Sequence, residues 1–219
     1  MADKKEVQDL YDKISSDFSE RRNYPWPEVV DYIENSKKGK NAIDLGCGNG
    51  RHIPHLSQIY ETVIGLDISK AMLCEARYKL EKENLEKQEF ELIQGDITYI
   101  PFKDEVFDCI INIATFHHLP TTKDRIKALN EMFRVLKEDK EVLFSVWSIE
   151  HEYFDGNRKE IRENDFDYNV TWESNGRRLE RYYHIFDEKR LKRQLGKSDF
   201  EIKSLELSSG NYYVRLHKP

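Results

Sequence analysis

The sequence predicts a single α/β domain built on a parallel, doubly wound sheet. Short apolar runs alternate with amphipathic segments along the chain, a pattern typical of strands joined by crossover helices. The 219 residues are too few for two complete domains of ordinary size. They also fall short of the roughly 250 that a barrel of eight strands and helices usually needs, so an open sheet is expected.

Two helices are expected before the sheet. Apolar side chains recur at helical spacing from Asp3 to Phe18, which predicts an amphipathic helix that acts as a lid or brace on the main body. Pro27 can occupy the first position of a second helix that runs to about Asn35. The polar stretch 36–40, which contains a glycine, ends this helix.

Strands and crossover helices then alternate. The predicted strands are Asn41–Leu45, Thr62–Leu66, Phe90–Gln94, Phe107–Ile113 and Glu141–Trp147. The helices expected between them are roughly Arg51–Ile59, Lys70–Glu83 and Lys123–Leu136. In an open sheet of this kind, ligands bind in the crevice at the carboxyl ends of the strands.

The last part of the chain is expected to add an insertion and two hairpins. The charged stretch from His151 to Tyr168 has few aliphatic residues and is expected to be an insertion or a flexible lid. The Asn175-Gly176 pair favours a tight turn between strands Tyr168–Trp172 and Arg177–Tyr183.

A capped helix and a second hairpin should end the fold. Asp187 can cap a helix that runs to about Lys197, and Phe200–Leu207 with Tyr212–Leu216 should complete the sheet. We therefore expect one domain over residues 1–219. It is divided into N-terminal helices (1–40), a central core (41–149), the insertion and its hairpin (150–186), and a C-terminal helix with two strands (187–219).

Composition argues against several classes of protein. With 35 Lys and Arg against 41 Asp and Glu, the net charge of −6 is not that of a protein that coats nucleic acid non-specifically. No apolar run approaches the roughly 20 residues of a membrane span, and the charged start lacks a signal peptide, so we expect a cytoplasmic protein with no membrane contact. Cys47, Cys74 and Cys109 lack the spacing of metal ligands, so free thiols and no metal are expected.

The strongest motif follows the first predicted strand. Asp44 lies at the end of this strand, and Gly46, Gly48 and Gly50 follow at alternate positions before a helix. Glycines there let the backbone turn sharply and pass close to a ligand. Alone, such a turn is weak evidence, since NAD-binding folds, other nucleotide-binding folds and some structural loops use related turns.

Three carboxylates at strand ends separate these alternatives. Asp44 can face a cationic amine at a position where it would repel a pyrophosphate. Asp67 ends the second strand, where an acidic side chain accepts hydrogen bonds from ribose hydroxyls. Asp96 follows the third strand, where a carboxylate can accept from an adenine amino group. Together they favour S-adenosylmethionine over a dinucleotide.

On these residues, the chain from Asn41 onward resembles S-adenosylmethionine-dependent methyltransferases with a Rossmann-like seven-stranded sheet. The resemblance implies strand order 3-2-1-4-5-7-6 with the seventh strand antiparallel, and makes 41–149 the cofactor-binding core. The expected cofactor-binding residues are Asp44, Gly46, Cys47, Gly48, Gly50, Asp67, Ile68, Asp96, Ile97 and Ile113.

Outside this core the sequence is similar to the yeast-type tRNA methyltransferases that esterify the 5-carboxymethyl group of wobble uridine 34, including the methyltransferase domain of the animal AlkB-homologue fusion protein. The similarity rests on Tyr11–Ile14 with Phe18-Ser19, and on Arg22–Pro27, Phe116–Leu119, Ser145–Trp147 and Arg181–Phe186. It implies methyl transfer from S-adenosylmethionine to a carboxylate on tRNA, which gives a methyl ester.

A carboxylate acceptor is already ionised at neutral pH, so the site must hold and orient an anion rather than deprotonate it. Arg22 and Arg181 are expected to grip the carboxylate or nearby phosphates. Trp147 or Tyr182 is expected to stack on the uracil. His117 would orient the acceptor, while a neighbouring histidine, His118, would hydrogen-bond the local backbone.

Two other functions stay open from the sequence. A small-molecule O- or C-methyltransferase of the quinone or phenolic type would keep the fold and His117 but leave Arg181 as a surface charge. A catalytically silent scaffold subunit would keep only the fold.

Two macromolecular partners are expected. Between Arg177 and Lys197, eight Lys and Arg stand against three Asp and Glu, which is a local net charge of +5 suited to a tRNA anticodon stem-loop. The third strand, Phe90–Gln94, should form an apolar edge of the sheet that invites strand addition. The resembled enzymes act with a small zinc-containing activator protein that pairs along this edge, so a heterodimer is expected.

Overall fold

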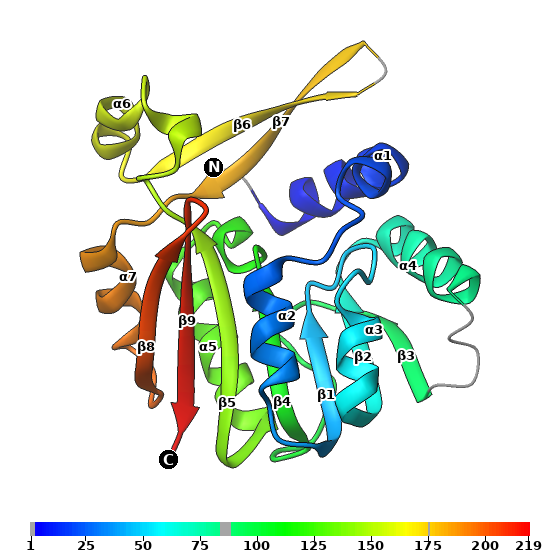
Figure 1. Ribbon diagram of the computed structural model, residues 1–219. Helices are drawn as coiled ribbons and strands as arrows, with labels where there is room; N and C mark the ends of the chain where they lie inside the picture. Colours follow the sequence, from blue (N-terminus) through cyan, green and yellow to red (C-terminus); the bar gives the residue numbers. More distant parts are fainter. Residues whose placement is uncertain (1–2, 84–88, 175) are drawn as a thin grey trace.

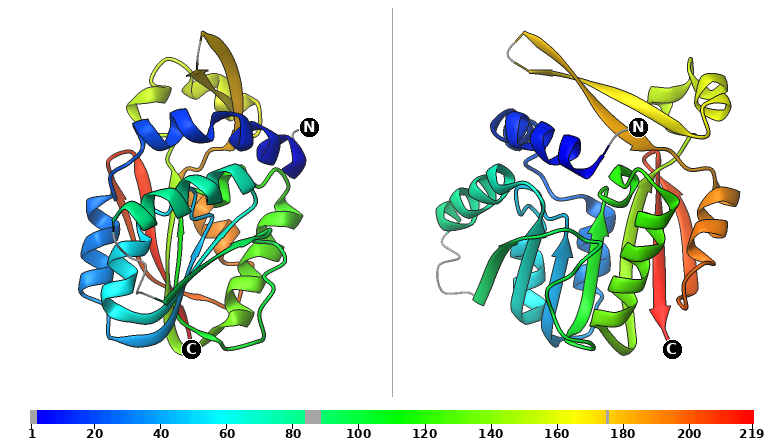
Figure 2. Two further views of the ribbon diagram at one scale, coloured as in Figure 1. Left: turned by 90° about the vertical axis from the view of Figure 1, so that its right-hand side faces the viewer. Right: turned by 180° about the vertical axis from the view of Figure 1, so that it is seen from behind.

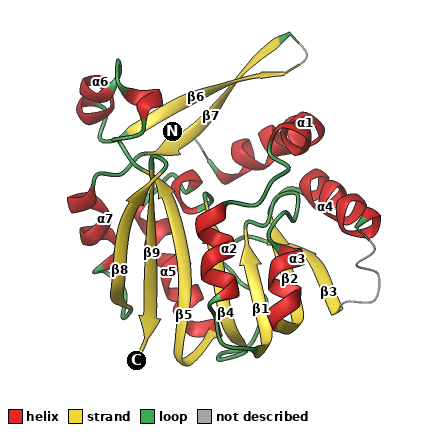
Figure 3. Ribbon diagram, viewed as in Figure 1, coloured by secondary structure: helices red, strands yellow, loops and turns green. Residues whose placement is uncertain are grey.

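The fold is built on one large sheet and a separate hairpin (Figures 1 and 3). The computed structural model describes residues 3–83, 89–174 and 176–219. The strands of the large sheet are β1 (Gly39–Leu45), β2 (Tyr60–Asp67), β3 (Glu89–Gln94), β4 (Phe107–Ile113), β5 (Leu136–Trp147), β8 (Glu201–Ser208) and β9 (Asn211–Lys218). The hairpin consists of β6 (Asp167–Ser174) and β7 (Arg177–His184).

Strand order confirms the expected class. Within the described residues, the large sheet has seven strands in the order β3-β2-β1-β4-β5-β9-β8. β1 to β5 pair in parallel, and β9 runs antiparallel to both β5 and β8. The late hairpin β8-β9 therefore completes the sheet as expected, and the carboxyl ends of the parallel strands meet at one edge.

The strand ladder departs from expectation at β5. It begins at Leu136, directly after α5 (Thr122–Val135), whereas the sequence predicted a start at Glu141. Leu136 pairs with Phe107 and Glu141 with Cys109, so β5 carries extra residues opposite β4. Asp139 in this bulge has a φ of 55°. The charged residues 137–140 interrupt the apolar run and concealed the beginning of the strand.

Helices cover both faces of the sheet (Figure 2). α2 (Pro27–Glu34) and α3 (Ile53–Ile59) lie on one face and α5 on the other, while α4 (Lys70–Lys82) follows β2 and α7 (Glu188–Leu195) precedes β8. Asp187 accepts a hydrogen bond from Arg190 N and caps α7 as expected. In the described part of the chain, no helix is both long and apolar enough to cross a membrane.

The first helix, α1 (Lys4–Arg21), lies across the carboxyl ends of the strands, between α4 and the β6-β7 hairpin (Figures 1 and 2). It starts with a capping box formed by Asp3 and Glu6 and extends three residues beyond the expected end at Phe18. Asp12 Oδ1 accepts from Ser69 Oγ at 2.6 Å and from Ala71 N at 3.1 Å, which ties α1 to the start of α4. On the hairpin side, Trp172 Nε1 donates to Asp17 Oδ2 at 2.7 Å.

The segment expected to be an insertion or a flexible lid forms defined secondary structure in a small subdomain. Its elements are η2 (Glu152–Phe154), α6 (Arg158–Glu163) and the hairpin. Fully buried Phe154 and Ile161 pack in an apolar cluster with hairpin residues, so few aliphatic side chains are enough to order this segment. Of the expected turn, Asn175 lies outside the described residues, and Gly176 has a φ of +71°.

The packing of Phe144 in the core should contribute strongly to stability. Phe144 of β5 is fully buried, and its ring centroid lies 4.7 Å from that of Phe116. Phe144→Ala should lower the free energy of unfolding by about 3–5 kcal/mol, because the lost contacts leave a cavity. Tyr78→Ala, at a side chain that is 67% exposed, should change it by no more than about 0.5 kcal/mol. Denaturant unfolding measures both, and equal losses would contradict this packing.

Candidate active site

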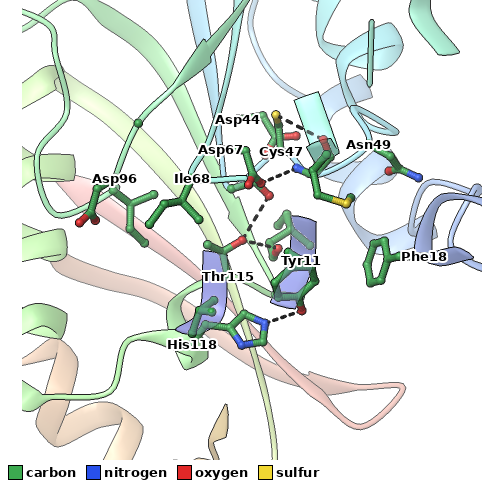
Figure 4. A pocket seen from close by; sticks show the side chains of 18 of the residues that line it. Tyr11, Phe18, Asp44, Cys47, Asn49, Asp67, Ile68, Asp96, Thr115 and His118 are labelled. Carbon is green, nitrogen blue, oxygen red and sulfur yellow. Dashed lines mark hydrogen bonds between the residues drawn. The ribbon is translucent and has the colours of Figure 1, made fainter. Parts of the chain in front are cut away.

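A cavity opens at the carboxyl ends of β1, β2 and β4, beneath α1 (Figure 4). Of the expected cofactor residues, those that line it are Asp44, Gly46, Cys47, Gly48, Asp67, Ile68, Asp96, Ile97 and Ile113. Gly50 is the exception, since a Cβ there would lie 3.1 Å from Ala76 of α4, away from the cavity lining. The side chains of α1 that the sequence analysis missed are Lys4, Val7, Tyr11 and Phe18.

The glycine loop is pinned to β2 by its backbone. Gly46 N and Cys47 N both donate to Leu66 O, at 2.7 and 3.1 Å. Gly46 has a φ of +77°, and a Cβ at this position would collide with Thr115. Only glycine satisfies both the backbone conformation and the close approach, which leaves a cradle open to a ligand.

Asp44 is a buried carboxylate without a hydrogen-bond partner on Oδ2 among the described residues. It is 1% exposed, and burial raises its pKa to about 7 although Arg51 opposes the shift. His52 Nδ1 lies 3.9 Å away, but burial holds the pKa of this imidazole well below its usual value, so it is neutral at pH 7. Arg51 acts on the carboxylate without forming an ion pair with it among the described residues, so a cation from a ligand can take that place.

Asp67 is held in place by backbone donors at the end of β2. Its Oδ1 accepts from Ser69 N and its Oδ2 from Gly48 N, both at 2.8 Å. Burial raises its pKa to about 6, while these hydrogen bonds lower it. Each oxygen can accept a further hydrogen bond, so the fixed carboxylate can receive hydroxyl donors from a ligand.

Asp96 is paired with α1. Lys4 Nζ lies 2.6 Å from Asp96 Oδ2, and Thr98 N donates to Oδ1 at 2.8 Å. Burial acts to raise the pKa of Asp96, but these hydrogen bonds hold it below its usual value. The first turn of α1 thus closes this end of the cavity through an ion pair.

A second cavity adjoins the first and brings together four of the expected acceptor-side residues. These are Arg22, His117, Trp147 and Arg181. Arg51 and Tyr11 line both cavities, and neither was among the site residues expected from the sequence.

The fifth expected residue, Tyr182, lies elsewhere, because neighbouring side chains on a strand point to opposite faces. Its hydroxyl donates to Asp167 Oδ1 at 2.7 Å. Tyr183, not Tyr182, lines the cavity beside Arg181 and Trp147.

Arg181 is the principal charge on the acceptor side. The residue is only 5% exposed. Its guanidinium carbon lies 4.6 Å from the ring centroid of Trp172 and 5.4 Å from that of Tyr183. Among the described residues it forms no ion pair with a carboxylate, and its Nε has no hydrogen-bond partner. A buried guanidinium that is stacked on aromatic rings but unpaired is suited to an anionic ligand.

The two histidines of η1 (Phe116–His118) are buried and neutral. Burial lowers the pKa of His117 well below its usual value, and its Nδ1 accepts from Trp147 N at 3.2 Å. Burial lowers the pKa of His118 to about 3. His118 Nδ1 donates to Tyr182 O and its Nε2 accepts from Tyr11 Oη, both at 2.9 Å. The expected bond from His118 to the backbone exists, but it reaches β7 rather than the local chain.

Trp147 lines the cavity but is also stacked. Its ring centroid lies 4.9 Å from that of Tyr183 and 5.0 Å from that of His151, at interplanar angles of 24° and 28°. These contacts fix the indole within the aromatic wall between β5 and the hairpin.

Residues 43–144 match the family described as methyltransferase domain. This part of the chain, from β1 into β5, is similar to methyltransferase domains. The chain is 34% identical over 157 residues to the tRNA (carboxymethyluridine(34)-5-O)-methyltransferase alkbh8 of Xenopus tropicalis, a match that covers 72% of this chain and 23% of that relative. This similarity confirms the resemblance that the sequence motifs indicated, although the chain spans less than a quarter of that relative's length.

Solved structures share this fold. An S-adenosylmethionine-dependent methyltransferase from Clostridium acetobutylicum superposes with a TM-score of 0.70 at 16% identity, covering 95% of this chain and 99% of that one. A chain from the complex between the Haloferax volcanii Trm112 methyltransferase activator and a methyltransferase superposes with a TM-score of 0.70 at 15% identity, covering 97% of each.

Asp44 should make cofactor affinity depend on pH. The carboxylate attracts the ammonium of S-adenosylmethionine only when ionised, and its pKa is about 7. Affinity should therefore fall as the pH falls through 7, by about fivefold between pH 7 and pH 6. Calorimetry should find weaker binding and a shallower pH dependence for Asp44→Asn, whereas Glu61→Gln, at an exposed position of β2, should behave as the parent. An unchanged pH dependence in Asp44→Asn would assign the titration to another group.

Proposed function

We propose that this methyltransferase transfers the methyl group of S-adenosylmethionine to the carboxylate of 5-carboxymethyluridine at the wobble position of tRNA, giving the methyl ester. The observation that carries the proposal is the buried guanidinium of Arg181, which forms no ion pair with a carboxylate among the described residues and lines a cavity next to the cofactor cavity. An ionised carboxylate is the acceptor that supplies the missing negative charge.

The residues of the first cavity fit the cofactor. Asp44 would face the ammonium of its methionine part, the backbone at Gly46 and Gly48 would lie against it, and Asp67 would accept from its ribose hydroxyls. When bound, S-adenosylmethionine supplies an electrophilic methyl carbon, whose transfer forms an O–C bond, breaks the C–S bond, leaves the electron pair on sulfur and moves no proton.

The second cavity holds the acceptor by charge rather than by acid–base chemistry. Arg181 binds and orients the carboxylate, and exposed Arg22 at the mouth of the same cavity adds positive charge. No general base is required, because the acceptor is ionised at neutral pH. The neutral state of His117 accords with a role in orienting the acceptor.

The burial of Arg181 argues against a small-molecule methyltransferase of the quinone or phenolic type. That alternative required Arg181 to be a surface charge, whereas this residue is only 5% exposed. Burying a guanidinium is costly unless an anion pairs with it, and a neutral quinone or phenol supplies no such anion.

Support for tRNA comes from the named relative and from the distribution of charge. Exposed basic residues on the hairpin and around α7 that form no ion pair in the described chain are Arg177, Lys189, Arg193 and Lys197. Their phosphate contacts would position an anticodon stem-loop, while the cavity reads the modified base. This surface is local, in keeping with the net charge of −6.

We also propose a heterodimer with a small methyltransferase activator, the kind of partner named in the Haloferax volcanii complex. Among the described strands, β3 lies at the edge of the sheet and pairs with β2 alone. Half-buried Phe90, Leu92 and Ile93 pack on the two core layers from this edge. A partner strand placed here would cover both the apolar side chains and the free backbone groups.

Arg181→Ala should abolish most acceptor methylation. Because removing one partner of a buried charge pair costs about 2–5 kcal/mol, kcat/KM for tRNA that carries 5-carboxymethyluridine should fall about 30-fold or more. Cofactor affinity and thermal stability should be measured on the same sample. If both match the parent, the loss of activity is confined to binding and orientation of the acceptor. The matched control is Arg177→Ala, an exposed arginine of the same strand, which should lower kcat/KM less than tenfold. Parental activity in Arg181→Ala would refute the proposed function.

The activator should protect one edge of the sheet. In hydrogen exchange of the complex, amides of β3 (Glu89–Gln94) should be protected relative to the free chain. Amides of β8 (Glu201–Ser208), at the opposite edge, should exchange unchanged. Protection at β8 alone, or no complex after co-expression, would exclude this heterodimer without affecting the proposed reaction.

A further inference from the structure

The acceptor cavity contains a second buried polar group without a partner, of opposite hydrogen-bonding character to Arg181. Asn211, the first residue of β9, is 5% exposed and lines this cavity. Its Nδ2 donates to Ser209 O at 3.1 Å, which fixes the orientation of the amide because a carbonyl can only accept. Its Oδ1 has no donor in the described chain.

The ladder places this amide on the cavity side of the sheet. Asn211 pairs directly with Trp147 across β5 and β9, and paired residues project to the same face. Tyr213, two residues further along β9, shares that face and also lines the cavity, where its ring packs 6.1 Å from that of Trp26. Asn211 is thus part of the same wall as the aromatic residues that enclose the acceptor.

Another acceptor in the cavity, Glu28, is already occupied. Its Oε1 accepts from Ser208 Oγ at 2.7 Å and from Ser209 Oγ at 3.1 Å, and Tyr213 Oη donates to its Oε2 at 3.4 Å. Glu28 therefore has its hydrogen bonds supplied from within the chain. Among the described residues that line the cavity, the buried side-chain atoms without a hydrogen-bond partner are Arg181 Nε, a donor, and Asn211 Oδ1, an acceptor.

A ligand that satisfies both groups carries an anion and a separate N–H donor. We propose that Asn211 Oδ1 accepts a hydrogen bond from the N3–H of the acceptor base, so that Asn211 selects uracil over cytosine; this inference rests on the proposed function. Uracil carries a proton on N3, whereas N3 of neutral cytosine is an acceptor. With cytosine, two hydrogen-bond acceptors, Asn211 Oδ1 and N3 of the base, would face one another. Asn211 Oδ1 would stay unpaired, and this cost disfavours binding of a cytosine substrate.

The test uses two RNA stem-loops that differ only in the wobble base, 5-carboxymethyluridine or 5-carboxymethylcytidine. Both carry the same carboxylate for Arg181, so their ratio of kcat/KM isolates recognition of N3. The parent should prefer the uridine substrate about 100-fold. Asn211→Ala should reduce this ratio about tenfold or more, whereas Asn211→Asp, which keeps an oxygen in place, should retain the preference for uridine with lower kcat/KM on both substrates.

Asn169→Ala serves as the matched control, since Asn169 is exposed on β6 outside the acceptor cavity, and it should keep the parental ratio. Equal rates of the parent on the two RNAs, or a parental ratio in Asn211→Ala, would overturn the role of Asn211 and leave the proposed function intact. No methylation of either RNA by the parent would overturn the proposed function and the inference with it. If Asn211→Ala fails to fold, loss of the preference in Asn211→Asp is the result that contradicts the proposal.

Discussion

The site depends on two buried ionisable side chains, the Asp44 carboxyl and the Arg181 guanidinium, neither of which forms an ion pair with a charged side chain among the described residues. Desolvating a charge costs several kcal/mol unless an opposite charge compensates. Here the two charges line adjoining cavities, so neither neutralises the other and each is left for a ligand. The fold therefore offers an anionic end for a cationic cofactor and a cationic end for an anionic acceptor.

α1 completes both cavities, although it precedes the sheet in sequence. Lys4 pairs with Asp96 at one end, Asp12 holds the start of α4, and Tyr11 lines the two cavities and donates to His118 Nε2. Asp17 receives Trp172 Nε1 from the hairpin, so the helix also fixes the aromatic platform on which Arg181 stacks. Through these contacts the helix covers part of both cavities at the carboxyl ends of the strands.

The sequence predicted what local periodicity and sheet geometry determine. Strand ends of a parallel sheet converge, so Asp44, Asp67 and Asp96 could be placed together before any coordinates were considered. It could not predict which face of the late hairpin packs inward, and so Tyr182 was expected where Tyr183 lies. Arg51 and Asn211 lie in none of the motifs that indicated the family, and Tyr11 lies in a motif that does not say where its side chain points, because all three positions in the site depend on packing between elements distant in sequence. A search for polar residues on strands next to the acceptor motifs could have singled out Asn211.

The acceptor cavity is suited to an anion, because buried Arg181 lines it. The most direct test compares the affinities of two RNA stem-loops in the presence of S-adenosylhomocysteine, one with 5-carboxymethyluridine and one with the neutral 5-carbamoylmethyluridine at the wobble position. The two substituents are nearly equal in size and differ in charge. The stem-loop with 5-carboxymethyluridine should bind at least about tenfold more tightly than the neutral one, because its carboxylate pairs with buried Arg181. Charge-assisted hydrogen bonds are stronger than neutral ones by more than about 1 kcal/mol. Equal affinities would contradict the account.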